Sequence, residues 1–421
     1  MRIANGFLAS IVALGIASAV LASATQASVI TIINNDGAGE GFNDPTPAAP
    51  VGGNPGVTIG AQRLYVFQYA ANIWGSLLPS AVPITVQAVF DPLTCTATSA
   101  VLGSAGPLIV WRDFLGAPVP AHWYHSAEAN KLYGVDLDGT TDDISARFNS
   151  SLNGSPACLG GTGWYLGVDG NEGTNIELLP VVLHELGHGL GFSTTTNGNT
   201  GTWLLSYPGI FDKFLLDAPT SLHWDGGAMT NAQRATSSRS CGGLRWDGPS
   251  VVAGSPSYLG ARPLLRVNAP VVIAGDYQVG QASFGGALTN AGVTGNVVLV
   301  NDGVGTVTDA CEALTPGSLT GQIALVDRGT CGFVIKVKNC QDAGAIAVIV
   351  ADNVAGCPPA GLGGADPTIT IPSVRVTQAD GNILKANLVG QNVTLITDPA
   401  VKAGADAMNR VFMFSPNPFQ S

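Results

Sequence analysis

The sequence predicts a mixed α+β fold that is joined to a separate α/β domain. Apolar residues recur at helical spacing over residues 62–78, and they alternate as in a strand over residues 84–90. Further on, a strand, a short helix and a second strand follow one another from residue 322, within the roughly 30 residues of a βαβ unit. The 421 residues are enough for two or three domains of ordinary size.

Composition excludes several classes of partner. The chain has 18 Lys and Arg against 29 Asp and Glu, which gives a net charge of −11. A chain without a basic stripe cannot offset phosphate charge, so nucleic acid and anionic membranes are not expected partners. Hydrophobic residues make up 46% of the chain, which is enough to build substantial cores.

Residues 1–27 predict a secretory signal peptide. Arg2 precedes an apolar stretch over residues 7–21, and small residues then lead to a cleavage site after Ala27, with Ala24 as the alternative. The apolar stretch is short for a membrane span. We therefore expect a mature chain that is exported to the periplasm or the medium and has no transmembrane segment.

In the first half of the chain, the expected elements follow a loop rich in Gly, Pro, Asn and Asp over residues 36–60. The helix at 62–78 has four apolar residues on one face, namely Leu64, Phe67, Ala71 and Trp74. The strand at 84–90 is followed by a second at 144–152. A further helix starts after residue 177, where Pro180 is tolerated because it lies in the first turn.

The second half predicts an independent domain over residues 255–398. Strands are expected at 322–326, 345–351 and 369–376, and Gly344 ends a helix at 334–343. Thr377 resembles the first residue of a capping box that opens another helix. The remaining residues, 399–421, are too few to form a domain.

Seven cysteines indicate an oxidising compartment. Four of them lie close together in sequence, and we expect two disulfides among them, in one of three pairings: Cys311, Cys331, Cys340 and Cys357. Cys95, Cys158 and Cys241 are scattered, so one of these three is expected to stay unpaired.

The segment HELGH at residues 184–188 has the residue types of a hydrolytic zinc site. His184 and His188 are four residues apart, so both imidazoles project from one face of a helix toward one Zn2+ ion. Glu185 lies on the same side, where it can take a proton from water activated by the metal. Two structural histidines on a helix are the alternative interpretation.

The motif continues as GLGF at 189–192, in which Gly191 permits a sharp turn after the helix. This stretch resembles zinc metallopeptidases of the metzincin-like branch, and it differs from them at Thr194, where their third zinc ligand would stand. His223, followed by Trp224 and Met229, is similar in order to the His-Trp segment of leishmanolysin-like enzymes and is the first candidate for the third ligand. Weaker candidates are His122, His125, Asp212 and Asp217.

A second resemblance covers most of residues 255–398. The segment GQIALVDRGTCGF at 321–333, followed by AGA at 343–345, ADN at 351–353 and IPSV at 371–374, resembles a protease-associated (PA) domain. Such domains are non-catalytic and are thought to bind substrate or restrict access to it. The resemblance therefore implies a regulatory domain beside a peptidase.

Together, the two resemblances imply a secreted zinc-dependent endopeptidase. The implied organisation is a catalytic part at 28–254, the PA domain as an insertion at 255–398, and a return segment at 399–421. In that family a Ser-His-Trp segment and a Met-bearing turn follow the return segment. We therefore expect the third ligand to lie beyond Ser421, with His223 not a ligand. The alternative function is a non-catalytic secreted PA-domain binding protein with an incomplete zinc site.

Two weaker patterns concern calcium and substrate. The acidic segment at 136–143, with Asp136, Asp138, Asp142 and Asp143, has calcium-like spacing but lacks the final Glu of an EF-hand loop, which favours an acidic turn over a Ca2+ site. The strand at 144–152 precedes the HELGH helix. We expect it to be an edge strand that pairs with an extended protein or peptide substrate.

Overall fold

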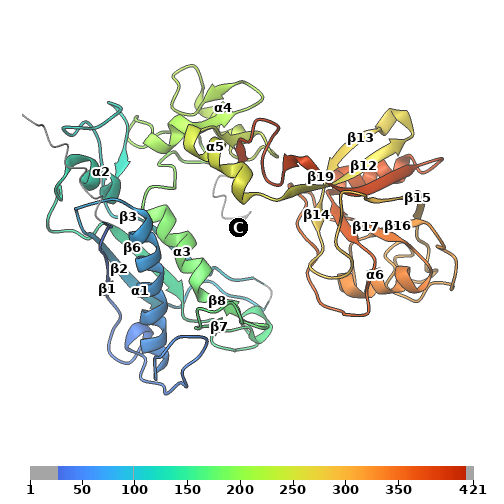
Figure 1. Cartoon of the computed structure of the whole chain (residues 1–421), viewed down its shortest axis with the longest axis horizontal. Helices are drawn as coiled ribbons and strands as arrows, with labels where there is room; N and C mark the ends of the chain where they lie inside the picture. Colours follow the sequence, from blue (N-terminus) through green and yellow to red (C-terminus); the bar gives the residue numbers. More distant parts are fainter. Residues whose placement is uncertain (1–26, 98, 414–421) are drawn as a thin grey trace, which may run out of the picture. The chain divides into compact units, whose positions relative to one another are not determined.

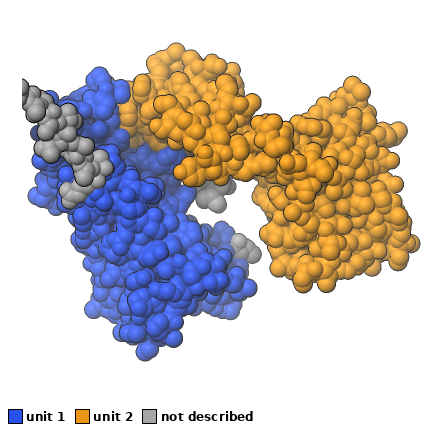
Figure 2. All heavy atoms as spheres, in the orientation of Figure 1, with its two compact units in different colours: residues 1–120, 124–193 blue, residues 121–123, 194–421 orange. Residues whose placement is uncertain are grey.

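The computed structural model of the chain describes residues 27–97 and 99–413, so almost all of the predicted signal peptide lies outside the described residues. The chain divides into two compact units (Figure 2). The first comprises residues up to 120 together with 124–193, and the second comprises 121–123 and the residues from 194 onward. The predicted domain boundaries at 254 and 398 stay predictions.

The first unit is a mixed α/β structure built around one sheet (Figure 1). Its longer elements and the strands of the sheet are β1 (Ile30–Asn34), α1 (Ile59–Leu77), β2 (Ile84–Asp91), β3 (Gly103–Pro107), α2 (Ser126–Tyr133), β6 (Ile144–Asn149) and α3 (Leu178–Gly189). Shorter elements lie between them, namely η1 (Gly41–Asn43), β4 (Val110–Trp111), β5 (Tyr124–His125), η2 (Leu159–Gly161), β7 (Trp164–Tyr165) and β8 (Ile176–Glu177). The predicted helix at 62–78 and the strands near 84 and 144 are confirmed.

The sheet has the strand order β1-β2-β6-β3. Strands β1, β2 and β6 run parallel, and β3 runs antiparallel to β6 with Ala105 opposite Ala146. The prediction that the strand beginning at Ile144 forms the edge is therefore wrong, because β3 covers its outer side. Strand β3 has the sequence Gly-Ser-Ala-Gly-Pro, which shows no apolar alternation and gave no strand signal.

Helices α1 and α3 pack side by side on one face of this sheet (Figure 1). The Trp74 indole of α1 donates a hydrogen bond to the Leu183 carbonyl of α3 at 3.0 Å. Below α1, four phenylalanine rings form the centre of the core, with neighbouring ring centroids 4.8 to 5.9 Å apart: Phe42, Phe67, Phe90 and Phe148. The apolar spacing that predicts α1 is therefore a consequence of its burial against the sheet.

The first turn of α1 tolerates no side chain at Gly60. A Cβ there would lie 2.4 Å from the Phe42 carbonyl oxygen, and the Gly60 amide donates to the Asp44 carbonyl at 3.1 Å. We expect Gly60→Ala to reduce the free energy of unfolding by about 1–3 kcal/mol because the backbone must shift to admit the methyl group. Thermal unfolding measures this loss. Gly254→Ala, at an open helical position, is the matched control and should cause none.

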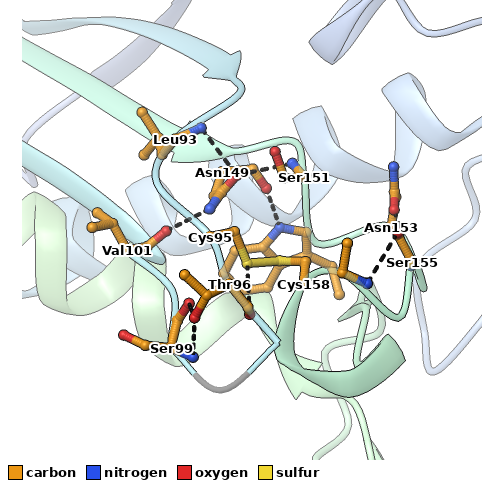
Figure 3. Close-up of a disulfide and its surroundings, with 12 residues drawn as sticks. Leu93, Cys95, Thr96, Ser99, Val101, Asn149, Ser151, Asn153, Ser155 and Cys158 are labelled. Atoms are coloured by element: carbon orange, nitrogen blue, oxygen red, sulfur yellow. Dashed lines mark hydrogen bonds between the residues drawn. A yellow bond between two sulfur atoms is a disulfide. The ribbon is translucent and has the colours of Figure 1, made fainter.

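A disulfide between Cys95 and Cys158 closes the loops beyond the end of β6 (Figure 3). Beside it, the Asn149 side chain accepts hydrogen bonds from the amides of Leu93 and Ser151, at 3.1 and 2.9 Å, and donates one to the Val101 carbonyl at 2.8 Å. One fully buried amide group therefore connects three loop segments.

The second unit begins with a small module. Its elements are η3 (Ile210–Phe214), β9 (Leu215–Asp217), β10 (Leu222–His223), α4 (Asn231–Ser237), β11 (Leu244–Trp246), α5 (Pro249–Tyr258) and, from the end of the described chain, β20 (Val411–Phe412). The strands form a sheet in the order β10-β9-β11-β20. A small core lies against it, with Trp224, Met229 and Leu244 fully or nearly fully buried.

The rest of the second unit is an eight-stranded sheet in the order β13-β12-β19-β15-β16-β17-β18-β14. Its elements are β12 (Ala261–Ala269), η4 (Val271–Ile273), β13 (Gly275–Gln278), β14 (Gly280–Gln281), β15 (Val293–Leu299), β16 (Ile323–Asp327), α6 (Phe333–Asp342), β17 (Ala347–Ala351), β18 (Ser373–Val376), α7 (Gln378–Ala386) and β19 (Asn392–Lys402). Strands β16 and β17 are parallel and joined by α6, which confirms the predicted βαβ unit. Thr377 caps α7 as predicted.

Alternate residues of β16 point into two different cores, as expected for a strand with a helix on each side. Leu325 belongs to the core that contains Leu384 of α7, whereas Val326 belongs to the core that contains Val337 of α6. The two helices therefore cover opposite faces of the sheet.

The cysteine pairing differs from the prediction. The disulfides are Cys95–Cys158, Cys241–Cys357 and Cys311–Cys331, and the free thiol is Cys340, which is buried. The expectation of two bridges within the 311–357 cluster is wrong, because Cys357 pairs with Cys241 and Cys340 stays a free thiol on the buried face of α6. Sequence spacing does not report which face of a helix a cysteine occupies.

A thiol assay tests this pairing. The folded chain should show no reactive thiol, and unfolding it without a reductant should expose one thiol per chain, because six of the seven cysteines are paired. Mass spectrometry should locate the label on Cys340. Labelling at any other cysteine, or more than one label per chain, would contradict the pairing.

The disulfides are consistent with an exported protein. In the described residues, no helix is both long enough and apolar enough to cross a membrane.

Candidate active site

Helix α3 carries the HELGH motif. Because one face of the helix is buried in the core, the histidines of the motif lie on the opposite, accessible face. Leu178, Val182 and Leu186 face the core, and Leu179 and Leu183 pack against its margin. Pro180 lies in the first turn, as predicted, where its missing amide costs no helical hydrogen bond. The remaining face, which includes positions 184 and 188, is accessible to solvent.

The two histidines of the motif converge. Their Nε2 atoms lie 3.1 Å apart, and their rings are nearly perpendicular with centroids 4.6 Å apart. Two nitrogens that each lie 2.0–2.1 Å from one tetrahedral zinc ion are separated by about 3.3 Å. The separation of His184 and His188 therefore fits a shared metal ion.

The tautomer of His188 also fits metal binding. Its Nδ1 atom lies 2.8 Å from the Phe192 carbonyl oxygen. Because a carbonyl only accepts hydrogen bonds, Nδ1 carries the proton and the lone pair is on Nε2, which faces His184. Residue types alone do not predict this contact, although the turn at Gly191 is the feature that brings Phe192 back to the helix.

Gly191 makes that turn. Its φ of +127° is a conformation that residues with a side chain rarely adopt. The turn is closed by hydrogen bonds from the Gly191 amide to the His188 carbonyl at 3.3 Å and from the Phe192 amide to the Gly187 carbonyl at 3.0 Å. The predicted role of Gly191 is therefore confirmed.

Glu185 is tied to the edge of the sheet. Its Oε2 atom accepts a hydrogen bond from the Ala105 amide of β3 at 3.1 Å. This amide points away from β6, so it is one of the edge groups that β3 leaves unpaired. The contact fixes one carboxylate oxygen of Glu185 and leaves Oε1 for other partners.

One of the other three histidines is buried, and the other two lie beside carboxylates. In the first unit, His125 is 3% exposed, and burial lowers its pKa to about 4. In the second unit, Nε2 of His122 lies 3.3 Å from an Asp225 carboxylate oxygen, and Nε2 of His223 lies 2.7 Å from Asp247. His223 therefore has only Nδ1 left for a metal.

The two weaker carboxylate candidates have structural partners. Asp212 is fully buried and accepts hydrogen bonds from the hydroxyls of Thr194 and Thr196 and from the Gly209 amide. Burial raises the pKa of Asp212 despite these bonds. Asp217 accepts a hydrogen bond from the Thr220 hydroxyl at 2.5 Å.

The acidic segment considered for calcium is a turn held by hydrogen bonds. The Asp143 side chain accepts from Asn130 at 2.9 Å and from the Thr85 amide at 3.0 Å, and Asp138 accepts from the Thr140 hydroxyl at 2.8 Å. Among the described residues, one group of three ligand atoms from His, Cys, Asp or Glu gathers within 4.8 Å, and it comprises Asp302, Asp309 and Glu312 instead. Calcium at 136–143 stays a prediction.

Comparison with known proteins supports one of the two resemblances. Residues 267–384 match the PA domain family. The chain contains a PA domain. The matched residues run from β12 to α7 and include both helices that cover the eight-stranded sheet. No match to a curated protein was found.

Several solved structures are similar to part of this chain. An aminopeptidase from Aneurinibacillus sp. strain AM-1 is 28% identical, with 34% of this chain and 31% of that chain covered and a TM-score of 0.26. BSAP, a zinc aminopeptidase from Bacillus subtilis, is 23% identical over 38% of each chain, also with a TM-score of 0.26. A peptidase M28 precursor from Shewanella amazonensis is 15% identical, covers 35% of this chain and 46% of that chain, and has a TM-score of 0.26. The chain thus spans less than half the length of each.

Proposed function

We propose that this chain is a secreted zinc-dependent endopeptidase in which His184 and His188 are metal ligands and Glu185 is the general base. The observation that carries the proposal is the convergence of the two Nε2 atoms at 3.1 Å, next to a carboxylate that is held in place by the edge strand. Two histidines with only a structural role would not need this arrangement.

The metal and the side chains have separate tasks. Zinc in such a site acts as a Lewis acid that acidifies water and polarises the scissile carbonyl. The Phe192 carbonyl keeps the His188 proton on Nδ1, so that Nε2 stays available as a ligand. The Ala105 amide holds Oε2 of Glu185, and Oε1 accepts the proton of the attacking water and then delivers it to the nitrogen of the leaving amine.

The substrate that suits this site is an extended peptide. Strand β3 has a free edge beside Glu185, and an extended chain can add to such an edge through main-chain hydrogen bonds. We therefore propose that β3, and not the strand at 144–152, pairs with the substrate. We further propose that the PA domain modulates access of substrate.

A zinc site with His184 and His188 needs a third protein ligand to be complete. His223 is the first candidate within the chain, and its Nε2 atom is hydrogen-bonded to Asp247 in the second unit. We propose that His223 is not the ligand. Zinc titration of a His223→Ala variant tests this point.

Casein hydrolysis by the protein secreted from its native host tests the function. The expected result is hydrolysis that a chelator abolishes and that added Zn2+ restores. Hydrolysis that persists after the metal is removed would overturn the proposal. A protein that is folded and zinc-free and shows no hydrolysis would favour the alternative, a secreted PA-domain binding protein.

A further inference from the structure

A cavity of about 200 Å³ lies in the first unit, at the C-terminal end of α1. It is lined by residues from four places in the chain, among them Ser28, Leu78, Glu128, Lys131 and Gly191. Glu128 and Lys131 of α2 are the charged groups of this lining, and the segments from β1, α1 and the turn after α3 contribute none. The cavity therefore contains a single carboxylate, that of Glu128.

The backbone nitrogen of Ser28 has more acceptors than a peptide group can use. It lies 3.0 Å from the Gly75 carbonyl oxygen and 2.9 Å from the Leu78 carbonyl oxygen. The Gly75 carbonyl has no partner in helix α1, because the residue four positions later is Pro79, which lacks an N–H. One peptide hydrogen is thus shared by two carbonyls, whereas an α-ammonium group has three hydrogens.

The absence of a side chain at Gly75, near the C-terminal end of α1, allows the Ser28 backbone to approach the helix. A Cβ at Gly75 would lie 2.4 Å from the Ser28 carbonyl oxygen, so a side chain at position 75 would prevent this approach. Ser28 is only 7% exposed, and its hydroxyl oxygen is buried without a hydrogen-bond partner. The preceding residue, Ala27, is exposed. Ser28 is therefore the first buried residue of the part of the chain that the structure describes.

The carboxylate in the cavity is unmatched. Burial raises the pKa of Glu128 to about 7, and Lys131 only partly offsets this effect. Among the described residues its carboxylate has no hydrogen-bond partner. Neutralising a buried carboxylate requires either a proton or a cation, and Ser28 lines the same cavity as Glu128.

We propose that this pocket binds the protein's own N-terminus: signal peptide cleavage after Ala27 creates an α-ammonium group on Ser28, which is held by the Gly75 and Leu78 carbonyls and by the Glu128 carboxylate. The proposal rests on the predicted cleavage site and is independent of the peptidase proposal. Hydrolysis of the Ala27–Ser28 amide by a signal peptidase consumes one water. It leaves a carboxylate on Ala27 and an amine on Ser28, and the amine takes up a proton.

The Glu128 carboxylate lies beside the turn that follows the HELGH helix. An Oε2 atom of Glu128 lies 3.4 Å from the place where a Cβ at Gly191 would be. Gly191 belongs to the turn that brings the Phe192 carbonyl to His188.

Two forms of the chain test this inference, one that starts at Ser28 and one that starts at Ala27. An N-terminal fusion removed by a protease that leaves no extra residue yields both. We expect the Ser28 form to unfold about 2–4 °C higher at pH 7. The α-ammonium pKa is raised in the folded state, so the added stability is present below pH 8 and is lost as the pH rises through the folded value. The two midpoints should therefore coincide at pH 10.

Side-chain variants test whether Glu128 is the partner of the Ser28 α-ammonium group. Glu128→Gln should remove the difference between the two forms, whereas Glu172→Gln, in a loop of the same unit, should leave it unchanged. A second measurement needs no variant: NMR titration of the 13C-methylated α-amine of the Ser28 form should give a pKa about one unit above the ordinary 7.7–8.0. Equal midpoints at pH 7, an ordinary α-amine pKa, or a secreted protein that starts at Thr25 would each overturn the proposal.

Discussion

Replacing Glu185 with Gln is expected to reduce kcat/KM for peptide hydrolysis by about 10²–10⁴-fold. The substitution keeps the size of the side chain and an oxygen that can still accept from the Ala105 amide, but it removes the group that takes the proton from water. Zinc binding should be unchanged because Glu185 is not a ligand. The variant is introduced into the protein secreted from its host, and hydrolysis of a fluorogenic peptide is measured.

Glu172→Gln is the matched control for this experiment. Glu172 lies in the loop before α3 and has no part in the proposed site, so its variant should hydrolyse the peptide at the wild-type rate. Full activity of the Glu185→Gln protein at normal zinc content would rule out Glu185 as the general base.

Replacing His188 with Ala is expected to weaken zinc binding by more than the roughly 10–100-fold that is typical for loss of an outer-shell partner. The variant removes one of the two nitrogens that lie 3.1 Å apart, and a single imidazole cannot hold the ion in their place. His184→Ala should have the same effect. Titration with zinc against a competing chelator measures both.

His223→Ala completes the set and distinguishes the two interpretations of the third ligand. The Nε2 atom of His223 is bound to Asp247, and we expect this variant to bind zinc as the wild type does. A loss equal to that of His188→Ala would identify His223 as the third ligand instead. Unchanged affinity in the His184 and His188 variants would show that zinc does not bind at the motif.

The parts of the fold that the sequence predicts are those with regular apolar patterns. Helix α1 and strand β2 follow from their periodicity, and the PA domain follows from motifs that the family comparison matches over residues 267–384. Strand β3 escaped prediction because its five residues are small and carry no pattern; the neighbouring strands impose its pairing. Because β3 was not predicted, the hydrogen bond from its Ala105 amide to Glu185 could not be predicted either.

The candidate site also has a part that the sequence predicts and a part that it does not. The spacing of His184, Glu185 and His188 identified them directly, since a helix places positions four residues apart on one face. The free cysteine was not predictable, because Cys340 is set apart from the other sulfurs by its burial on α6 and not by its sequence spacing. Contacts made by backbone atoms, such as the Phe192 carbonyl with His188, leave no signal in residue types.

Mass spectrometry of the products from a peptide blocked at both ends tests the central claim most directly. The peptide carries an acetylated N-terminus and an amidated C-terminus, so only cleavage at an internal bond can release fragments. A zinc-dependent endopeptidase should produce internal fragments with the wild-type secreted protein, and none after metal removal or with Glu185→Gln. An intact blocked peptide, together with loss of single residues from an unblocked one, would contradict an endopeptidase. Fragments that persist in the Glu185→Gln protein would contradict the assigned site.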